Sequence, residues 1–183
     1  MDCKKYYPQE LVYEMMIPGN LLKKVDELKA IHKMIDLAKD SGLLTRQEIV
    51  SMMPPALCDI QSHHSVLDMC AAPGSKTAQV LEMIMNDHSN ILGKPNTELP
   101  KGFVVANDAD HKRAYLLTHQ INRFNTSNIA VTNHNAQDFP SHYDIATKER
   151  VMFDRILCDV PCSSDAAIRK LPNKWVTWGT KES

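Results

Sequence analysis

The sequence lacks several features, and each absence excludes a class of protein. No apolar run approaches the ~18 residues that a membrane-spanning helix requires. The N-terminal string MDCKKYYPQE contains no apolar segment of the kind found in secretory signals. The net charge is −1 at pH 7, so no overall positive field attracts nucleic acid, and an RNA-binding face would have to come from local patches. We therefore expect a protein that acts away from membranes.

The cysteines and histidines lack the spacings of disulfide frameworks and zinc sites. There are five cysteines, an odd number, with no Cys-x-x-Cys pair and no histidines at zinc-ligand spacing, so we expect no metal. Without a secretory signal the thiols are expected to stay reduced, which predicts an intracellular protein of the nucleus or the cytoplasm. The cysteines are Cys3, Cys58, Cys70, Cys158 and Cys162.

The first part of the chain has the pattern of a small helical layer. Apolar residues recur every three or four positions over 21–40, which predicts an amphipathic helix that Gly42 ends. The string TRQE over 45–48 has the spacing of a capping box and is expected to open a short second helix. Pro54 and Pro55 are expected to end that helix.

After this layer the pattern changes to alternating strands and helices. Such alternation, with strands that are almost wholly apolar, is typical of a parallel sheet with helices on both faces. The expected strands are 65–70, 102–108, 129–133 and 153–161, and the expected helices are 77–87 and 109–124.

The expected fold class is therefore α/β. We expect a helical extension over residues 1–62 and the sheet domain over 63–183. Ligands of such sheets bind beyond the carboxyl ends of the strands. Chemically versatile residues follow each expected strand, at 70–76, at Asp108, at 133–138 and at 159–164. These segments are predicted to form one site.

The string DMCAAPGSKT (68–77) is a glycine-containing turn between a strand and a helix, suited to a nucleotide. Aligned with G-x-x-x-x-G-K-[ST], it puts Cys70 and Ser75 at the two glycine positions, and G-x-G-x-x-G is absent as well. A phosphate loop and a dinucleotide loop are thus disfavoured. S-adenosylmethionine fits better, because Asp108 supplies a carboxylate for its ribose hydroxyls. An ordinary turn is the alternative.

Four strings together resemble one enzyme family. RQEIVSMMPP, VLDMCAAPGSKT, VVANDAD and DRILCDVPCSSD are similar to motifs of the Nop/Sun-type RNA (cytosine-5)-methyltransferases, with the closest match in the tRNA-directed branch. The resemblance runs from about residue 7 to residue 178. It implies a Rossmann-like methyltransferase sheet, S-adenosylmethionine as cofactor, and transfer of a methyl group to carbon 5 of a cytosine in RNA, in this branch tRNA.

The resemblance also implies a mechanism and roles for residues. In the family a cysteine thiolate adds to carbon 6 of the cytosine, which makes carbon 5 nucleophilic, after the base has left its stack. Asp159 would contact the amine edge of the base, and Cys162 matches the cysteine that helps to release the methylated RNA. The residues implied to bind the cofactor are Cys70, Ala71, Ala72, Pro73, Gly74, Ser75, Lys76, Asp108, Arg113, Asn135 and Asp159.

The sequence departs from the family pattern in three respects. Asn135 stands where the family has an acid facing the adenine, so we expect weakened cofactor binding. The segment 164–167 lacks the glycines usual there, which is expected to alter the base-binding loop. The attacking cysteine of the family lies in a T-C-S motif on a later strand, and the sequence contains no such motif. The sheet is accordingly expected to be incomplete, lacking the C-terminal strands.

These departures leave alternatives open. The chain is interpreted as a fragment of an RNA methyltransferase without the nucleophile, and the alternative is an inactive product that binds cofactor or RNA. A small-molecule or protein methyltransferase is a third possibility. Cys158 is expected in the strand core. A disulfide from Cys158 to Cys162 is disfavoured, since their extended separation exceeds the ~7 Å limit between Cα atoms.

Overall fold

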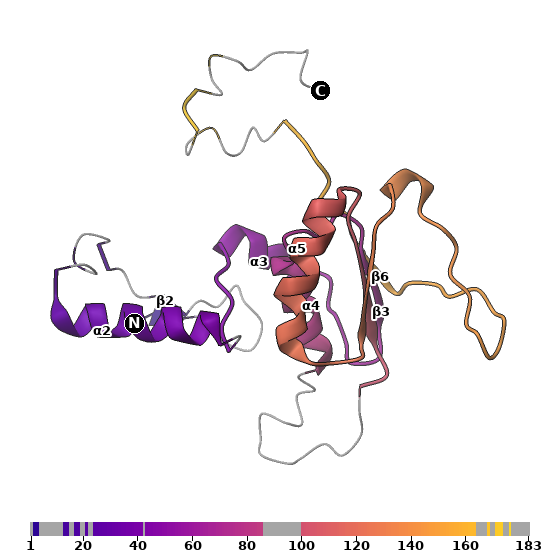
Figure 1. The fold of residues 1–183 in the computed structure, drawn as a ribbon, viewed down its shortest axis with the longest axis horizontal. Helices are drawn as coiled ribbons and strands as arrows, with labels where there is room; N and C mark the ends of the chain where they lie inside the picture. The colour runs from indigo at the N-terminus through magenta and orange to yellow at the C-terminus, as the bar shows by residue number, and fades with distance from the viewer. Residues whose placement is uncertain are drawn as a thin grey trace.

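The computed structural model describes residues 2–3, 13–14, 17–18, 21, 24–41, 43–85, 100–163, 168, 171–173 and 176. Figure 1 shows their arrangement, with a helix-bearing N-terminal segment followed by a sheet and its helices. In chain order the elements are β1 (Asp2–Cys3), β2 (Tyr13–Glu14), α2 (Asp26–Asp40), α3 (Ile49–Leu57), β3 (Ser65–Asp68), α4 (Ser75–Met85), β4 (Phe103–Asn107), α5 (His111–Ile121), η2 (Asn122–Phe124), β5 (Ile129–Thr132), η3 (Ala136–Asp138) and β6 (Arg155–Leu157).

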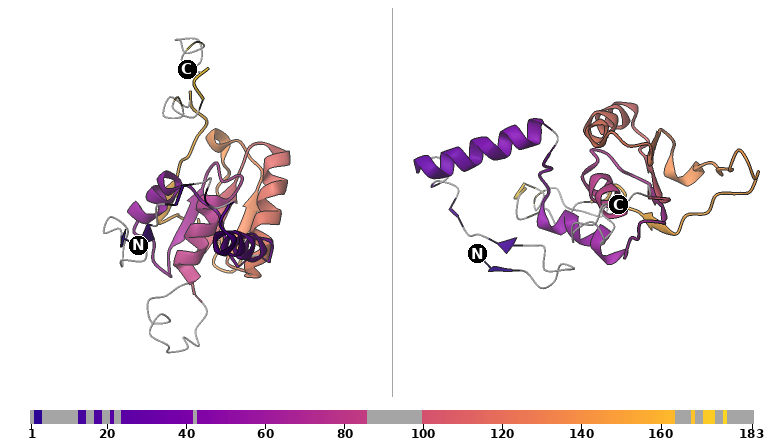
Figure 2. Two further views of the ribbon diagram at one scale, coloured as in Figure 1. Left: turned by 90° about the vertical axis from the view of Figure 1, so that its left-hand side faces the viewer. Right: turned by 90° about the horizontal axis from the view of Figure 1, so that it is seen from below.

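The central sheet has four parallel strands in the order β5-β4-β3-β6. The chain passes from β3 to β4 to β5 in one direction, so right-handed crossovers place α4 and α5 on the same face (Figures 1 and 2). The return from β5 to β6 contains η3 but no α-helix. The parallel α/β sheet is therefore confirmed. The prediction of helices on both faces is wrong for the described residues.

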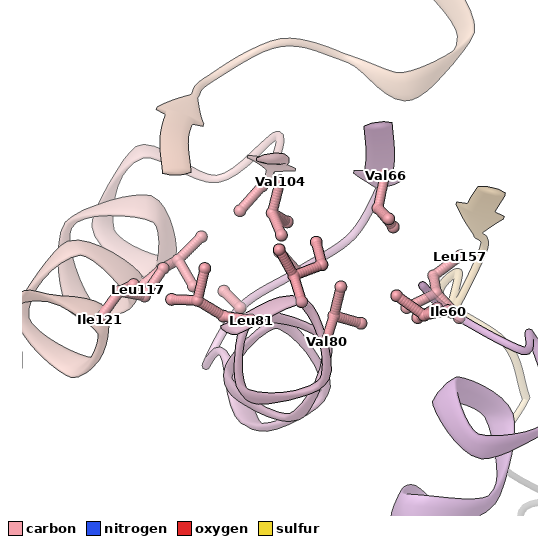
Figure 3. Packing of buried hydrophobic residues seen from close by; sticks show 12 residues of the cluster. Ile60, Val66, Val80, Leu81, Val104, Leu117, Ile121 and Leu157 are labelled. Carbon is pink, nitrogen blue, oxygen red and sulfur yellow. The ribbon is translucent and has the colours of Figure 1, made fainter. Parts of the chain in front are cut away.

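The main core lies between the sheet and helices α4 and α5 (Figure 3). Val66 and Val104 are register partners on this face, and Val80, Leu81 and Ile84 of α4 are fully buried against them. Burial of each such side chain contributes about 1.5–3 kcal/mol. The cluster is completed by Ile60, Ala71, Ala72, Ala106, Leu117, Ile121 and Leu157. This packing sets where the carboxyl ends of the strands lie relative to α4 and α5.

The opposite face of the sheet is covered only in its middle. Leu67 and Val105 are buried there, whereas Ile156 in the edge strand β6 is 52% exposed. Cys158 follows β6 and is exposed, with its Sγ atom 3.1 Å from Met69 Sδ. The prediction that Cys158 belongs to the strand core is wrong, because β6 ends at Leu157 and its edge position leaves the next residue open to solvent.

Helix α2 begins at Asp26, later than the predicted start at residue 21. Acidic residues in its first turn and Lys39 in its last suit the helix dipole. The Leu43 amide donates to the Ala38 carbonyl, which is the longer bond of a Schellman end. Gly42, predicted to end the helix, lies outside the described residues. No helix in the described ranges has both the length and the apolar character needed to cross a bilayer.

Helix α3 differs from the sequence prediction at both ends. Glu48 is its N-cap, without a side-chain capping bond, and Thr45 instead accepts a hydrogen bond from the Arg123 guanidinium. The helix also continues through Pro54 and Pro55 to Leu57. The Ser51 carbonyl that Pro55 cannot serve accepts a bond of 2.9 Å from the Gln47 amide, which reduces the cost of that proline. Both the capping box and the proline stop were therefore wrong predictions.

Candidate functional site

Beyond the carboxyl ends of β3 and β6 lies an open cavity of ≈ 1130 Å³. The chain continues from β3 to β4 on one side, whereas β6 lies on the other side of β3, and such a reversal of strand order in a parallel sheet is where ligands bind. Six of the residues implied by the resemblance line it. The full lining is Met69, Cys70, Asp108, Ala109, Asp110, Arg113, Asn135, Ala136, Gln137, Cys158, Asp159, Val160, Pro161 and Cys162.

The turn over 70–76 contributes only Cys70 to the lining. Ala71 and Ala72 are buried behind it, and the Ala72 amide donates to Asp108 Oδ2 at 3.1 Å. The peptide bond between Ala72 and Pro73 is cis. Ser75 is half-buried and begins α4. The turn thus supports the floor of the cavity, and the residues after Cys70 do not form its surface.

Gly74 has a packing reason to be glycine. Its φ of +105° lies in the region that side chains disfavour, and a Cβ there would stand 2.7 Å from Leu117 Cδ1. A Cβ at this position would force the Leu117 side chain or the turn itself to move. Gly74 therefore serves the approach of the two helices.

Asp108 and Arg113 are tied to the turn behind them. Asp108 is 3% exposed, and its Oδ1 accepts from the Asp110 amide at 3.0 Å. Arg113 donates to the Ala72 carbonyl at 2.5 Å and lies 3.4 Å from Asp108 Oδ2. These bonds hold the Asp108 carboxylate at the edge of the cavity, where it retains lone pairs for a further donor.

Asp159 and Lys76 form an ion pair that the sequence did not predict. Asp159 Oδ2 lies 2.7 Å from Lys76 Nζ, and the Lys76 side chain is only 15% exposed. The contact joins the loop after β6 to the first turn of α4. Lys76 does not line the cavity itself, but it orients the carboxylate of Asp159, which does.

Asp68, the last residue of β3, is a buried acid beneath this pair. It is 1% exposed and accepts from Thr77 Oγ1 at 2.7 Å, while its Oδ1 has no hydrogen-bond partner among the described residues. Burial raises the pKa of Asp68 to about 6, against the opposing effects of the Thr77 bond and the Lys76 charge. Within the expected strand 65–70, Asp68 has no predicted role of its own.

Three thiols, Cys70, Cys158 and Cys162, line the cavity. Burial raises the pKa of the Cys70 thiol, and the carboxylates of Asp108 and Asp68 raise it further. Cys70 is therefore disfavoured as a thiolate at neutral pH. Cys158 and Cys162 are exposed. No disulfide joins the cysteines whose side chains are described.

The loop after β5 supplies Asn135, Ala136 and Gln137. Asn135 precedes η3 and makes no side-chain capping bond to it. The altered segment 164–167 lies outside the described residues. In the ranges that the structure covers, no group of three His, Cys, Asp or Glu side chains is placed to hold a metal ion.

Sequence reasoning missed two residues that order the site. Asp110 lines the cavity and caps α5, with its side chain accepting from the Arg113 amide at 2.9 Å. An acid just before a helical pattern is a recognisable signal for such a cap. Asn107 is fully buried at the end of β4, and nothing in its sequence context distinguished it from other strand-end residues.

Comparison with known proteins places this geometry in a family. Residues 55–182 match the family described as 16S rRNA methyltransferase RsmB/F. The multisite-specific tRNA:(cytosine-C(5))-methyltransferase of Saccharomyces cerevisiae is 43% identical over 180 residues, which are 96% of this chain and 25% of the relative. The chain spans about a quarter of the length of the curated relatives it matches.

Two solved structures have similar folds. PH0851 has a TM-score of 0.61 and 25% identity, over 81% of this chain and 30% of that one. NSun6 of Pyrococcus horikoshii, solved with the S-adenosylmethionine analogue SFG, has a TM-score of 0.52 and 25% identity, over 69% of this chain and 27% of that one. The Nop/Sun resemblance is thereby confirmed, and this chain belongs to the RsmB/F family of RNA methyltransferases.

Proposed function

We propose that this chain forms the cofactor-binding part of an S-adenosylmethionine-dependent RNA (cytosine-5)-methyltransferase. One observation carries the proposal. Asp159 and Cys162, from the D-x-P-C-S string, line the same cavity as Cys70, Asp108 and Asn135, from the strand ends assigned to the cofactor. A methyl donor and a base have to meet for transfer, and this cavity offers residues for both.

The cavity suits the chemistry of the cofactor. S-adenosylmethionine, when bound, supplies a methyl group on a positively charged sulfur. Asp108 presents a carboxylate that accepts hydrogen bonds from ribose hydroxyls, and Asn135 presents an amide oxygen for the adenine amine. Arg113 orients Asp108, and residues 71–76 support the floor of the cavity. Its ≈ 1130 Å³ lies above the ~300–1,000 Å³ of ordinary ligand pockets, which leaves room for a base beside the cofactor.

The base-facing residues are Asp159 and Cys162. Lys76 holds Asp159 in one orientation, so that its free oxygen accepts from the amine edge of the cytosine. Cys162 also lines the cavity and is exposed, so its thiol is accessible to the RNA during release of the methylated product. The attacking thiolate of the family belongs to a T-C-S motif that these residues do not contain. The chemical part of this chain is therefore to bind the cofactor and orient the base.

The similarity to the yeast relative favours tRNA as the RNA substrate, because that protein is named for tRNA cytosine and the match covers 96% of this chain. A tRNA substrate would place the protein in the nucleus or the cytoplasm. We further propose that residues 1–62 are a helical extension of the methyltransferase domain. Its last part is firmly attached, since Ile60 belongs to the main core.

A second candidate function is cofactor or RNA binding without methyl transfer. The T-C-S cysteine is not among these residues, so on their own they account for binding alone. A chimera separates the two functions, in which this chain replaces the matched quarter of the Saccharomyces cerevisiae relative. Incubated with unmodified tRNA and S-adenosylmethionine, the chimera should produce 5-methylcytosine, detected by bisulfite sequencing. A chimera that binds S-adenosylhomocysteine yet makes no 5-methylcytosine would favour binding alone.

Substitutions in the chimera test the assigned roles. Asp159→Ala should abolish methylation, whereas Asp138→Ala, which removes an exposed carboxylate outside the cavity lining, should leave it unchanged. Cys162→Ala should accumulate a covalent protein–RNA adduct that survives denaturing electrophoresis. Normal turnover by Cys162→Ala, without an adduct, would remove its role in release.

A further inference from the structure

Asn107, the last residue of β4, joins two turns that border the cavity. It is fully buried, and its side-chain amide donates to the Met69 carbonyl at 3.0 Å and to the His134 carbonyl at 2.8 Å. Its side-chain oxygen accepts from Thr132 Oγ1 and from the His134 amide, both at 3.0 Å. Both donor hydrogens and both acceptor positions of one side chain are thus used.

The partners of Asn107 adjoin residues that line the cavity. Met69 precedes Cys70, and His134 precedes Asn135. Asn107 itself precedes Asp108, and its backbone carbonyl accepts from the Ala71 amide at 2.7 Å. The turns after three neighbouring strands are therefore fixed relative to one another through one side chain.

We infer that Asn107 is a positioning residue, which sets the spacing of Cys70, Asp108 and Asn135 and thereby the affinity for the cofactor. This inference rests on the proposed function, because it assumes that these three residues contact S-adenosylmethionine. Asn107 itself lies behind the cavity surface and does not line it. Its effect is transmitted through the Met69 and His134 carbonyls. Small displacements of binding groups have large effects on ligand complementarity.

The test replaces the amide by a carboxyl of the same shape. In Asn107→Asp, an ionised carboxyl cannot donate to either carbonyl, so the two turns should separate. The dissociation constant for S-adenosylhomocysteine, measured by calorimetry at pH 8, should rise about tenfold or more. Burial favours the protonated form of the introduced carboxyl, and that form donates one of the lost bonds. The ratio of variant to wild-type constants should therefore fall as the pH is lowered to 5.5.

Comparison with wild type at each pH removes the contributions of other groups around the site. Those nearby are Asp68 in β3, Cys70 after β3, Asp108 after β4, His134 after β5, and Arg113 on α5. Asn128→Asp is the matched control. Asn128 also donates twice, to the Pro100 carbonyl at 2.9 Å and the Gly102 carbonyl at 2.7 Å, but before β5 at the far end of the sheet. It should lower the unfolding midpoint and leave the dissociation constant within about twofold of wild type, as expected for a site distant from the ligand.

Three results overturn the inference: an unchanged constant in Asn107→Asp, a constant that rises equally in Asn128→Asp, or a ratio that does not depend on pH. If Asn107→Asp does not fold, Thr132→Val decides, because it removes only the bond to the Asn107 oxygen. It should raise the constant severalfold, and no rise would overturn the inference. Wild-type protein that does not bind S-adenosylhomocysteine would instead refute the proposed function.

Discussion

Asp68→Asn should stabilise the protein progressively as the pH rises. The pKa of Asp68 is raised from its ordinary value of 3.8 to about 6, mainly by burial. Between these values the folded state holds a proton that the unfolded chain has lost, so stability falls with rising pH. A shift of about two pKa units corresponds to about 3 kcal/mol of destabilisation once the carboxyl is fully ionised above pH 6. The variant removes this titration while keeping an oxygen for the Thr77 hydroxyl.

The measurement is denaturant unfolding of both proteins from pH 4.5 to pH 8. The free energy of unfolding of Asp68→Asn minus that of wild type should rise by about 2 kcal/mol over this range, since part of the penalty is already present at pH 4.5. If the new amide lowers the free energy of unfolding by an amount that does not depend on pH, the change of the difference with pH is unaffected. Asp110→Asn is the control. The Arg113 amide lowers the pKa of Asp110 below its ordinary value of 3.8, so Asp110 stays ionised in both states over most of this range and its difference should be nearly flat between pH 4.5 and pH 8. A flat difference for Asp68→Asn would refute the reasoning.

Three further predictions concern packing and reactivity. Leu81→Ala should lower the free energy of unfolding by about 2–5 kcal/mol in urea titrations, because Leu81 is fully buried between α4 and the sheet; a loss below 1 kcal/mol would contradict the core assignment. Gly74→Ala should destabilise the chain by about 1–3 kcal/mol in the same assay, through its positive φ and its contact with α5, and a neutral result would show that the turn can shift. Iodoacetamide should alkylate the exposed Cys158 faster than Cys70, whose pKa burial raises; mass spectrometry of timed samples that finds the reverse order would contradict the site electrostatics.

The location of the site was predictable because strand ends are readable from sequence. Cys70, Asp108, Asn135 and Asp159 each follow an apolar run, and parallel strands bring such positions to one edge. The sequence could not show how deeply each side chain is buried below that edge or which other side chains it contacts. The pairing of Lys76 with Asp159, between the first turn of α4 and the loop after β6, is one such feature, while its predicted contact with the cofactor stays a prediction.

Two predictions were wrong because tertiary packing outweighed the local sequence pattern. Local rules placed a helix end at Pro54 and Pro55, but packing of α3 on α4 and the bond from Gln47 to the Ser51 carbonyl outweigh the lost backbone bonds. Cys158 was predicted to be a core residue because it lies within the expected strand 153–161 and free cysteines are often buried. Its exposure follows from the edge position of β6, and strand order is not encoded in a local pattern.

The most direct test of the central claim is the affinity for S-adenosylhomocysteine, measured calorimetrically for wild type and for Asp108→Asn. The cavity beyond β3 and β6 is proposed to hold this ligand through the Asp108 carboxylate. Wild type should bind one equivalent, and Asp108→Asn should bind about tenfold more weakly, because hydrogen bonds to a charged group are the stronger ones. Absence of binding to folded wild type, or equal affinity of the two proteins, would contradict the account.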